Sequence, residues 1–228
     1  MIDIFLYVEN AGSVQFNIFI KQKIVDRSNK MIDPFYYMKI LLYICNMTII
    51  YSNWNDEDCR CLQRVWQCIS DVNVIEITSD MNDWDDVVDE AIANESDTLI
   101  FLGHGSTRGL FAPDYNYGLY ILHENNVHLI HARNVICCWC HASTFVKNHN
   151  LNAFATSMFI SNVNEASDNG ITNYTQDQIN DNSIRFYDEI NYLIRENIPL
   201  SEWVMMLGDH MDIDNEIDVF NRQRLFYQ

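Results

Sequence analysis

Basic residues are scarce in this sequence, which holds 14 lysines and arginines against 32 aspartates and glutamates and carries a formal net charge of −18. Nucleic-acid binding needs a basic face that holds phosphates, so the composition argues against nucleic acid as a partner. Two interpretations of the acidity remain open. An acidic cleft attracts a basic substrate or partner, or the charge serves solubility alone.

Signals for export and for membrane insertion are also missing. The first residues, "MIDIFLYVEN", have no basic segment and carry acids early, unlike a secretory signal. The longest apolar stretch, residues 35–51, is interrupted by Lys39 and Asn46 and is close to the minimum length of a membrane span. We therefore expect a cytoplasmic protein with no membrane partner, in which this stretch is a helix or strand that continues into a buried strand.

The seven cysteines lack the pattern of a disulfide framework. Their number is odd, and the close neighbours are Cys59 with Cys61, and Cys137 with Cys138 and Cys140. This spacing favours a reducing compartment in which the cysteines are buried or reactive. A chain of 228 residues can bury a sizeable core without disulfides, and it shows no internal repeat or low-complexity segment.

Short apolar segments alternate with amphipathic segments after residue 38. Residues 39–52, 72–79 and 97–102 have the character of buried strands, whereas residues 56–70 and 82–96 have apolar positions at helical spacing. Strands that alternate with helices in this way imply a mostly parallel sheet covered by helices on both faces. The sequence therefore predicts an α/β fold.

We expect one domain over residues 38–228 and an N-terminal extension over residues 1–37, with a β-hairpin around "NAGS". The remaining expectations are strands at 131–140 and 153–162, a hairpin excursion at 109–126, a short helix at 143–151, a loop at 162–182, helices at 184–197 and 199–211, and an edge strand within 217–228.

Reactive side chains follow two of the predicted strands. "LIFLGHG" reaches His104, between Gly103 and Gly105, and "NVICCWCHAS" reaches Cys140. Catalytic groups gather beyond the carboxyl ends of parallel strands, and the chain between these two residues has room for one excursion and a return to a neighbouring strand. The pattern predicts a thiol nucleophile with a histidine base, and the amides of Gly105 and Cys140 as donors to an oxyanion. A structural histidine in a glycine turn is the alternative for His104.

Cys140 is the cysteine that we expect to react. Alternation along the strand places Cys138 and Cys140 on one face and Cys137 and Trp139 on the other. Cys137 and Cys138 lie within the apolar run, where a cysteine is usually a small buried apolar residue. A zinc site is the competing interpretation, because Cys137 and Cys140 have C-x-x-C spacing. Nearby histidines could complete such a site: His123, His128, His131 and His141. Against a zinc site, an extended strand places Cys137 and Cys140 on opposite faces, and the sequence has no second ligand pair at matching spacing.

The motifs "TLIFLGHG" and "NVICCWCHAS" resemble those of caspase-like cysteine peptidases, most closely the CHAT peptidases of bacteria, which are relatives of caspases, separase, gingipain and clostripain. "AFATSMFISNVNEASDNGI" and "SIRFYDEI" extend the resemblance over residues 98–207. It implies a caspase-like three-layer sandwich with a mostly parallel central sheet flanked by helices, His104 as base, Cys140 as nucleophile and peptide hydrolysis through an acyl-enzyme. The sequence departs from the family at Trp139, where relatives usually carry Ala or Gly.

The resemblance also implies that the P1 side chain enters a pocket beside the cysteine. An acidic residue at the base of this pocket would select Arg or Lys at P1 through a charge-assisted contact. The strand and loop that follow the cysteine contain no Arg of the kind that would select Asp at P1, and the nearest exception is Arg108. A basic P1 residue is our first expectation and a neutral or apolar one the second. The candidates for substrate binding are Asp114, Asn164, Glu165 and Asp168.

The sequence thus predicts a cysteine endopeptidase that cleaves a protein or peptide substrate and needs no metal or organic cofactor. The resemblance implies a role as the protease arm of a bacterial defence or regulatory system, triggered by a regulatory partner, by residues 1–37 or by self-cleavage. Two alternatives remain: an inactive caspase-like protein that binds a basic partner by charge, and a zinc-stabilised regulator.

Overall fold

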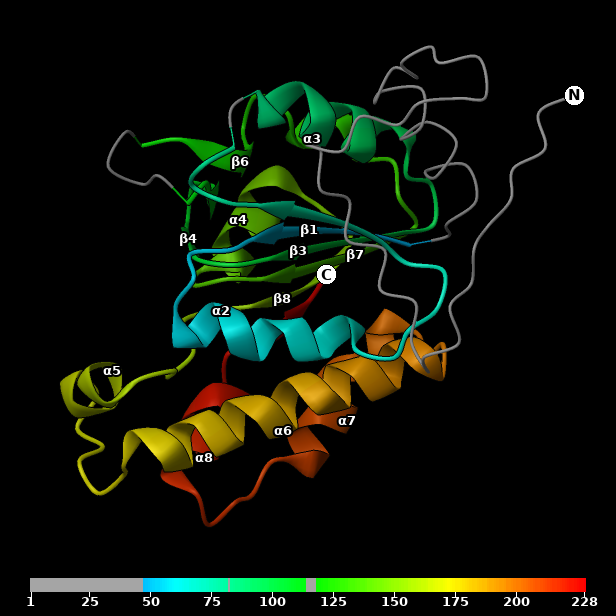
Figure 1. The fold of residues 1–228 in the computed structure, drawn as a ribbon. Helices are drawn as coiled ribbons and strands as arrows, with labels where there is room; N and C mark the ends of the chain where they lie inside the picture. Colours follow the sequence, from blue (N-terminus) through cyan, green and yellow to red (C-terminus); the bar gives the residue numbers. More distant parts are fainter. Residues whose placement is uncertain (1–46, 82, 114–117) are drawn as a thin grey trace, which may run out of the picture.

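The computed structural model describes residues 47–228, except residue 82 and residues 114–117 (Figure 1). The expected hairpin in residues 1–37, the first part of the apolar stretch and Asp114 lie outside the described residues. Within the described part of the chain, no helix is both long enough and apolar enough to cross a membrane.

A six-stranded sheet forms the centre of the described fold, with the strand order β2-β1-β3-β7-β8-β9. The first five strands are parallel, and β9 pairs antiparallel with β8 as the edge strand expected near the C-terminus. This confirms the predicted α/β class with a mostly parallel sheet. The strands are β1 (Met47–Ser52), β2 (Asn73–Ile77), β3 (Thr98–Leu102), β7 (Asn134–Cys138), β8 (Ala153–Thr156) and β9 (Leu225–Tyr227).

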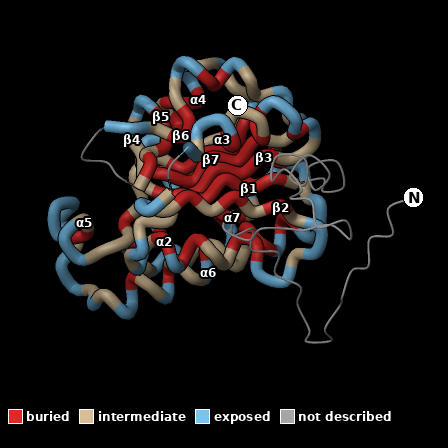
Figure 2. The backbone as a smooth tube through the Cα atoms, turned by 45° about the horizontal axis from the view of Figure 1, so that its top comes forward, coloured by how far each residue is buried: buried red, intermediate tan, exposed pale blue. Residues whose placement is uncertain are grey.

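Helices cover both faces of this sheet (Figure 1). One face packs against α3 (Trp84–Asn94) and α4 (Ala142–His149), and the other packs against α2 (Glu57–Leu62), α6 (Gln176–Arg195) and α7 (Leu200–His210). Because both faces are buried, the inner strands β1, β3, β7 and β8 are buried along nearly their whole length, whereas the edge strand β2 alternates. Figure 2 shows the result as a band of buried backbone through the centre of the molecule.

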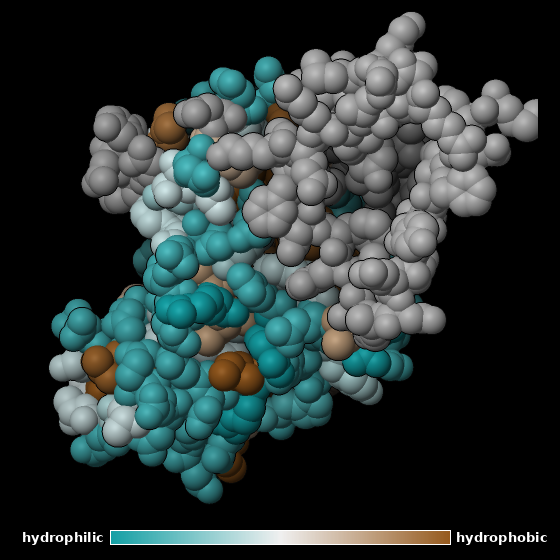
Figure 3. All heavy atoms as spheres, viewed as in Figure 1, coloured by the Kyte–Doolittle hydropathy of each residue, from teal (hydrophilic) through white to brown (hydrophobic). Residues whose placement is uncertain are grey.

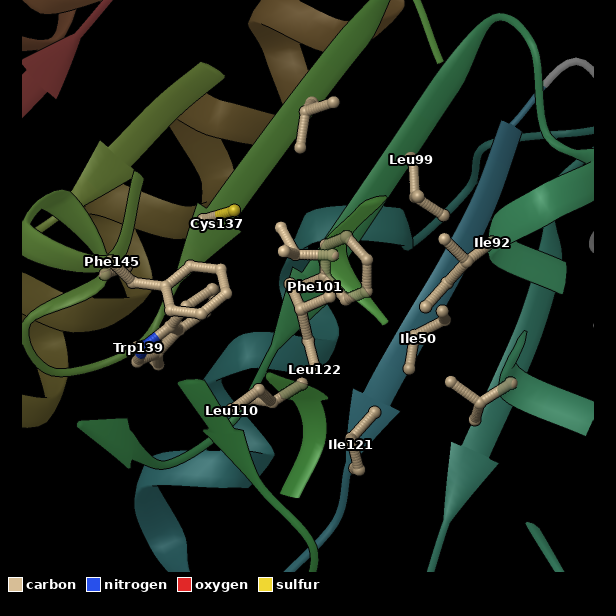
Figure 4. Packing of buried hydrophobic residues seen from close by; sticks show 14 of the residues in the cluster. Ile50, Ile92, Leu99, Phe101, Leu110, Ile121, Leu122, Cys137, Trp139 and Phe145 are labelled. Atoms are coloured by element: carbon tan, nitrogen blue, oxygen red, sulfur yellow. The ribbon is translucent and has the colours of Figure 1, made fainter. Parts of the chain in front are cut away.

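The two cores divide the side chains of β7 between them. Cys137 and Trp139 belong to the core under α3 and α4, whereas Cys138 belongs to the core under α2, α6 and α7. Figure 4 shows Trp139 beside Phe145 of α4 in the first core. The predicted alternation along β7 is therefore confirmed, and Cys137 and Cys138 are buried apolar residues, with 0% and 2% exposure.

The excursion after β3 forms a small antiparallel sheet of three strands, β4 (Gly105–Ser106), β5 (Gly109–Phe111) and β6 (Tyr120–His123). The expected hairpin is β5 with β6, and β4 adds a third strand directly after His104. This small sheet lies beyond the carboxyl ends of the central strands (Figure 1).

The expected loop over residues 162–182 is partly wrong. Residues Val163–Asp168 form α5, because the Asn162 side chain accepts hydrogen bonds from the Asn164 and Glu165 amides and so caps this helix. The long helix α6 begins at Gln176, eight residues before the predicted start at residue 184, because Thr175 and Gln178 form a reciprocal capping box. Helix α8 (Glu216–Arg222) occupies the first part of the segment where only an edge strand was expected.

The described surface is largely hydrophilic in the view of Figure 3. This agrees with the strongly acidic composition and with the few large apolar side chains that are exposed, among them Met205 and Ile213.

Candidate active site

His104 and Cys140 follow the tips of two paired strands. Leu102 at the end of β3 pairs with Cys138 at the end of β7, and the Gly103 amide donates to the Cys138 carbonyl at 3.3 Å. Each reactive residue is therefore two positions beyond the same register pair. Both line a small cavity of about 50 Å³, together with Asp58, Trp139, Ser161 and others. The structure thus brings the expected histidine and cysteine to one cleft.

His104 is held by a carboxylate that the sequence interpretation missed. Its Nε2 lies 2.7 Å from Oδ2 of Asp56, and the ring of Trp54 contacts it edge-on with the centroids 5.6 Å apart. With Nε2–H donating to Asp56, Nδ1 is the nitrogen that accepts a proton. Asp56 follows β1, which neighbours β3 on the side away from β7. An acidic residue directly after a third strand tip was therefore the signal in the sequence that could have identified Asp56.

The position of Asp56 is fixed by the start of α2. Its Oδ1 accepts a hydrogen bond from the Cys59 amide at 2.8 Å, which makes Asp56 the N-cap of this helix. Burial raises the pKa of Asp56, but the hydrogen bonds from the Cys59 amide and from His104 outweigh it, so that the pKa lies below its ordinary value of 3.8. The carboxylate is therefore ionised at neutral pH and offers one oxygen to the helix and the other to the imidazole.

The Cys140 thiol is half-buried next to acidic groups. Burial together with the charges of Glu165 and Asp58 raises the pKa of Cys140 to about 11, although a backbone hydrogen bond with Phe159 lowers it. Among the described residues no hydrogen bond joins Cys140 to His104. A thiolate at this position thus depends on a base that takes the proton.

Trp139, the unusual neighbour of Cys140, is accommodated by Gly105. A Cβ atom on Gly105 would lie 2.1 Å from Cδ1 of the tryptophan, so the missing side chain leaves the space for this ring. The ring also packs against Phe145, and its Nε1 donates to the Ser106 carbonyl at 3.1 Å. The bulky residue thereby ties the segment after His104 to the helix that follows Cys140.

Of the three predicted substrate-binding residues that the structure describes, only Glu165 approaches the cavity. Its carboxylate accepts from the Ser161 amide at 2.9 Å and lies 3.0 Å from the Ser161 hydroxyl, and Ser161 lines the cavity. Asn164 and Asp168 are exposed on α5 away from the cavity lining, and Asp114 lies outside the described residues.

Asp58 is a second acid that the sequence interpretation missed. It lines the cavity, and its Oδ2 lies 2.9 Å from the Ser161 hydroxyl, which Glu165 also approaches. A hydroxyl has one proton, so it can satisfy only one of the two carboxylates. Burial raises the pKa of Asp58 despite the Ser161 hydrogen bond and the nearby His104. A cationic group is the natural complement of this pair of acids.

The residues of the competing zinc interpretation do not form one site. Cys137 is buried in the core under α3 and α4, and His123 lines a separate, larger cavity of about 970 Å³ beside Arg108. Arg108 stacks on the Tyr120 ring there, 5.3 Å from its centroid, and is not part of the small cavity. Another set of metal-ligand types does gather among the described residues: Asp56, Cys59 and His104.

Comparisons with protein-family models, with curated proteins and with solved structures found no match to this chain. The fold and the site therefore define a class only: an α/β protein whose parallel strands bring a thiol, an imidazole and carboxylates to one edge. The family resemblance of the two motifs stays a prediction.

Proposed function

We propose that this protein is a cysteine endopeptidase with a caspase-like architecture. The observation that carries the proposal is the geometry of the strand tips, where His104 and Cys140 line one cavity and Asp56 holds the imidazole at 2.7 Å. A nucleophile, a base and a group that orients the base are the parts that acyl transfer requires.

The proposed reaction begins with transfer of the Cys140 proton to Nδ1 of His104. The resulting thiolate attacks the peptide carbonyl, and the amides of Gly105 and Cys140 donate to the oxyanion. Asp56 stabilises the imidazolium, which then protonates the leaving amine. Water, activated by His104, hydrolyses the acyl-enzyme and restores the thiol.

A basic P1 residue fits the charges around the cavity. Asp58 lines the cavity and Glu165 reaches it through Ser161, so both acids flank the position beside Cys140. The guanidinium of Arg or the ammonium of Lys would pair with these carboxylates. A neutral P1 residue is the second choice. The substrate is a protein partner, and the family resemblance suggests a defence or regulatory setting inside the cell.

An inactive binding protein on the same fold is the second candidate. The raised pKa of Cys140, about 11, favours it, because the thiol is then not ionised at neutral pH in this conformation. Such a protein would use the same acidic pocket to bind a basic partner.

The test is covalent labelling with a peptide acyloxymethyl ketone that carries Arg at P1, measured by intact mass. Wild type and Cys68→Ala, which removes an exposed cysteine outside the cavity, should gain one label, and Cys140→Ala should gain none. Equal labelling of Cys140→Ala and wild type would overturn the assignment of the nucleophile. Absence of label in all three would favour the binding protein.

A further inference from the structure

Three residues with different ligand chemistry meet beside the proposed catalytic base. One ligand atom from each of Asp56, Cys59 and His104 lies within 4.8 Å of the other two. Asp56 and Cys59 are three residues apart at the start of α2, and His104 follows β3, so two neighbouring strand tips supply the set. The proposed peptidase reaction uses the imidazole and the carboxylate but not the Cys59 thiol.

We propose that Asp56, Cys59 and His104 form a zinc site. A thiolate, an imidazole and a carboxylate are the ligands of protein zinc sites, whereas Ca²⁺ and Mg²⁺ take oxygen ligands. Three protein ligands leave the fourth tetrahedral position to water or another group. This site differs from the pair Cys137 and Cys140, which β7 places on opposite faces.

The fold holds one ligand atom of each of the three residues within 4.8 Å of the others, so that the arrangement needs only local shifts to bind a metal. The Cys59 side chain is fully buried, its thiol donates to the Ser52 carbonyl at 3.4 Å, and its own carbonyl accepts from the Tyr51 hydroxyl at 2.7 Å. Asp56 keeps Oδ1 on the Cys59 amide while Oδ2 points at His104. Metal–ligand bonds of about 2.0–2.3 Å place tetrahedral ligand atoms roughly 3.3–3.7 Å apart. The 2.7 Å contact between Asp56 and His104 therefore has to widen by less than about 1 Å.

Binding releases one proton. The Cys59 thiol loses its proton and becomes a thiolate ligand, while His104 moves its proton from Nε2 to Nδ1 and ligates through Nε2. The Asp56 carboxylate is already ionised. No oxidant or reductant is involved.

Zinc at this site would block the proposed peptidase, because Nδ1 of His104, the atom that accepts the Cys140 proton, would already carry a proton. This consequence rests on the proposed function, whereas the zinc site itself does not. A chain that binds zinc here but cleaves nothing would keep this inference and lose the peptidase.

The test is titration of the purified, chelator-treated chain with Co²⁺, which reports a thiolate ligand through a charge-transfer absorption band. Wild type should develop the band with one equivalent, and one equivalent of Zn²⁺ should abolish it. Cys59→Ser should lose the band and bind at least about tenfold more weakly. Cys61→Ser, on the same helix, and Cys140→Ala should keep both properties.

His104→Ala provides a second variant that leaves the buried Cys59 in place, and its affinity for Co²⁺ should also fall at least about tenfold. Absence of the band in wild type would overturn the proposal. Loss of the band in Cys140→Ala with retention in Cys59→Ser would also overturn it, because the metal would then lie on the proposed nucleophile.

Discussion

Asp56 has two roles that a pair of substitutions separates. Asp56→Ala removes the N-cap of α2, which costs about 1 kcal/mol of unfolding free energy, and also removes the partner of His104. Asp56→Asn keeps a side-chain oxygen for the Cys59 amide and caps a helix about as well as Asp. The pair with His104 adds little to stability, because the two side chains are 34% and 42% exposed and such pairs contribute less than about 1 kcal/mol. Asp56→Asn should therefore be nearly as stable as wild type.

Activity should respond differently. Both substitutions remove the charge that stabilises the imidazolium, so both should lower kcat for an Arg-containing peptide by about 10²–10⁴-fold and leave KM within about twofold. The assays are urea unfolding and peptide cleavage, both with a chelator present. Thr175→Ala, which removes the N-cap of α6 at a residue that does not line the cavity, is the control and should lose stability without losing kcat. Wild-type kcat in Asp56→Asn would refute the proposed role of Asp56.

Three further predictions concern the cavity and its surroundings. Alkylation of Cys140 by iodoacetamide should rise about tenfold per pH unit from pH 7 toward its pKa of about 11, as measured by mass spectrometry; a plateau below pH 9 would contradict the raised pKa of this half-buried thiol. Gly105→Ala should lower the unfolding free energy by about 1–3 kcal/mol, because its Cβ meets Trp139 at 2.1 Å, and the double variant with Trp139→Ala should show less than additive losses in urea unfolding. Asp58→Asn should lower kcat/KM for Arg peptides at least about tenfold relative to their neutral analogues, whereas Asp168→Asn should change neither; equal losses for both peptide classes would exclude Asp58 as a specificity residue.

The parallel sheet was predictable because local patterns determine it. Both of its faces are covered, so the inner strands are nearly continuous apolar runs, and the amphipathic helices between the strands leave only parallel pairing with crossovers. The placement of His104 and Cys140 at one edge followed from the same topology. Capping was the weaker signal: α5 and the first turns of α6 are polar, and the side chains of Asn162 and Thr175 set where they begin.

Asp56 and Asp58 were harder to find, because the sequence shows several acids near the start of a helix and does not show which of them turn toward the sheet. Their orientation depends on the cap at the start of α2 and on contacts with residues far along the chain, His104 and Ser161. Trp139 likewise became interpretable only with Gly105, a residue in a different strand. Such long-range pairs leave no periodic trace in the sequence.

The most direct test of the account is digestion of a proteome-derived peptide library, with the cleaved bonds identified by mass spectrometry for wild type and Cys140→Ala. Wild type should cleave after Arg and Lys, and Cys140→Ala should lose those cleavages. Identical cleavage profiles for the two proteins would contradict it.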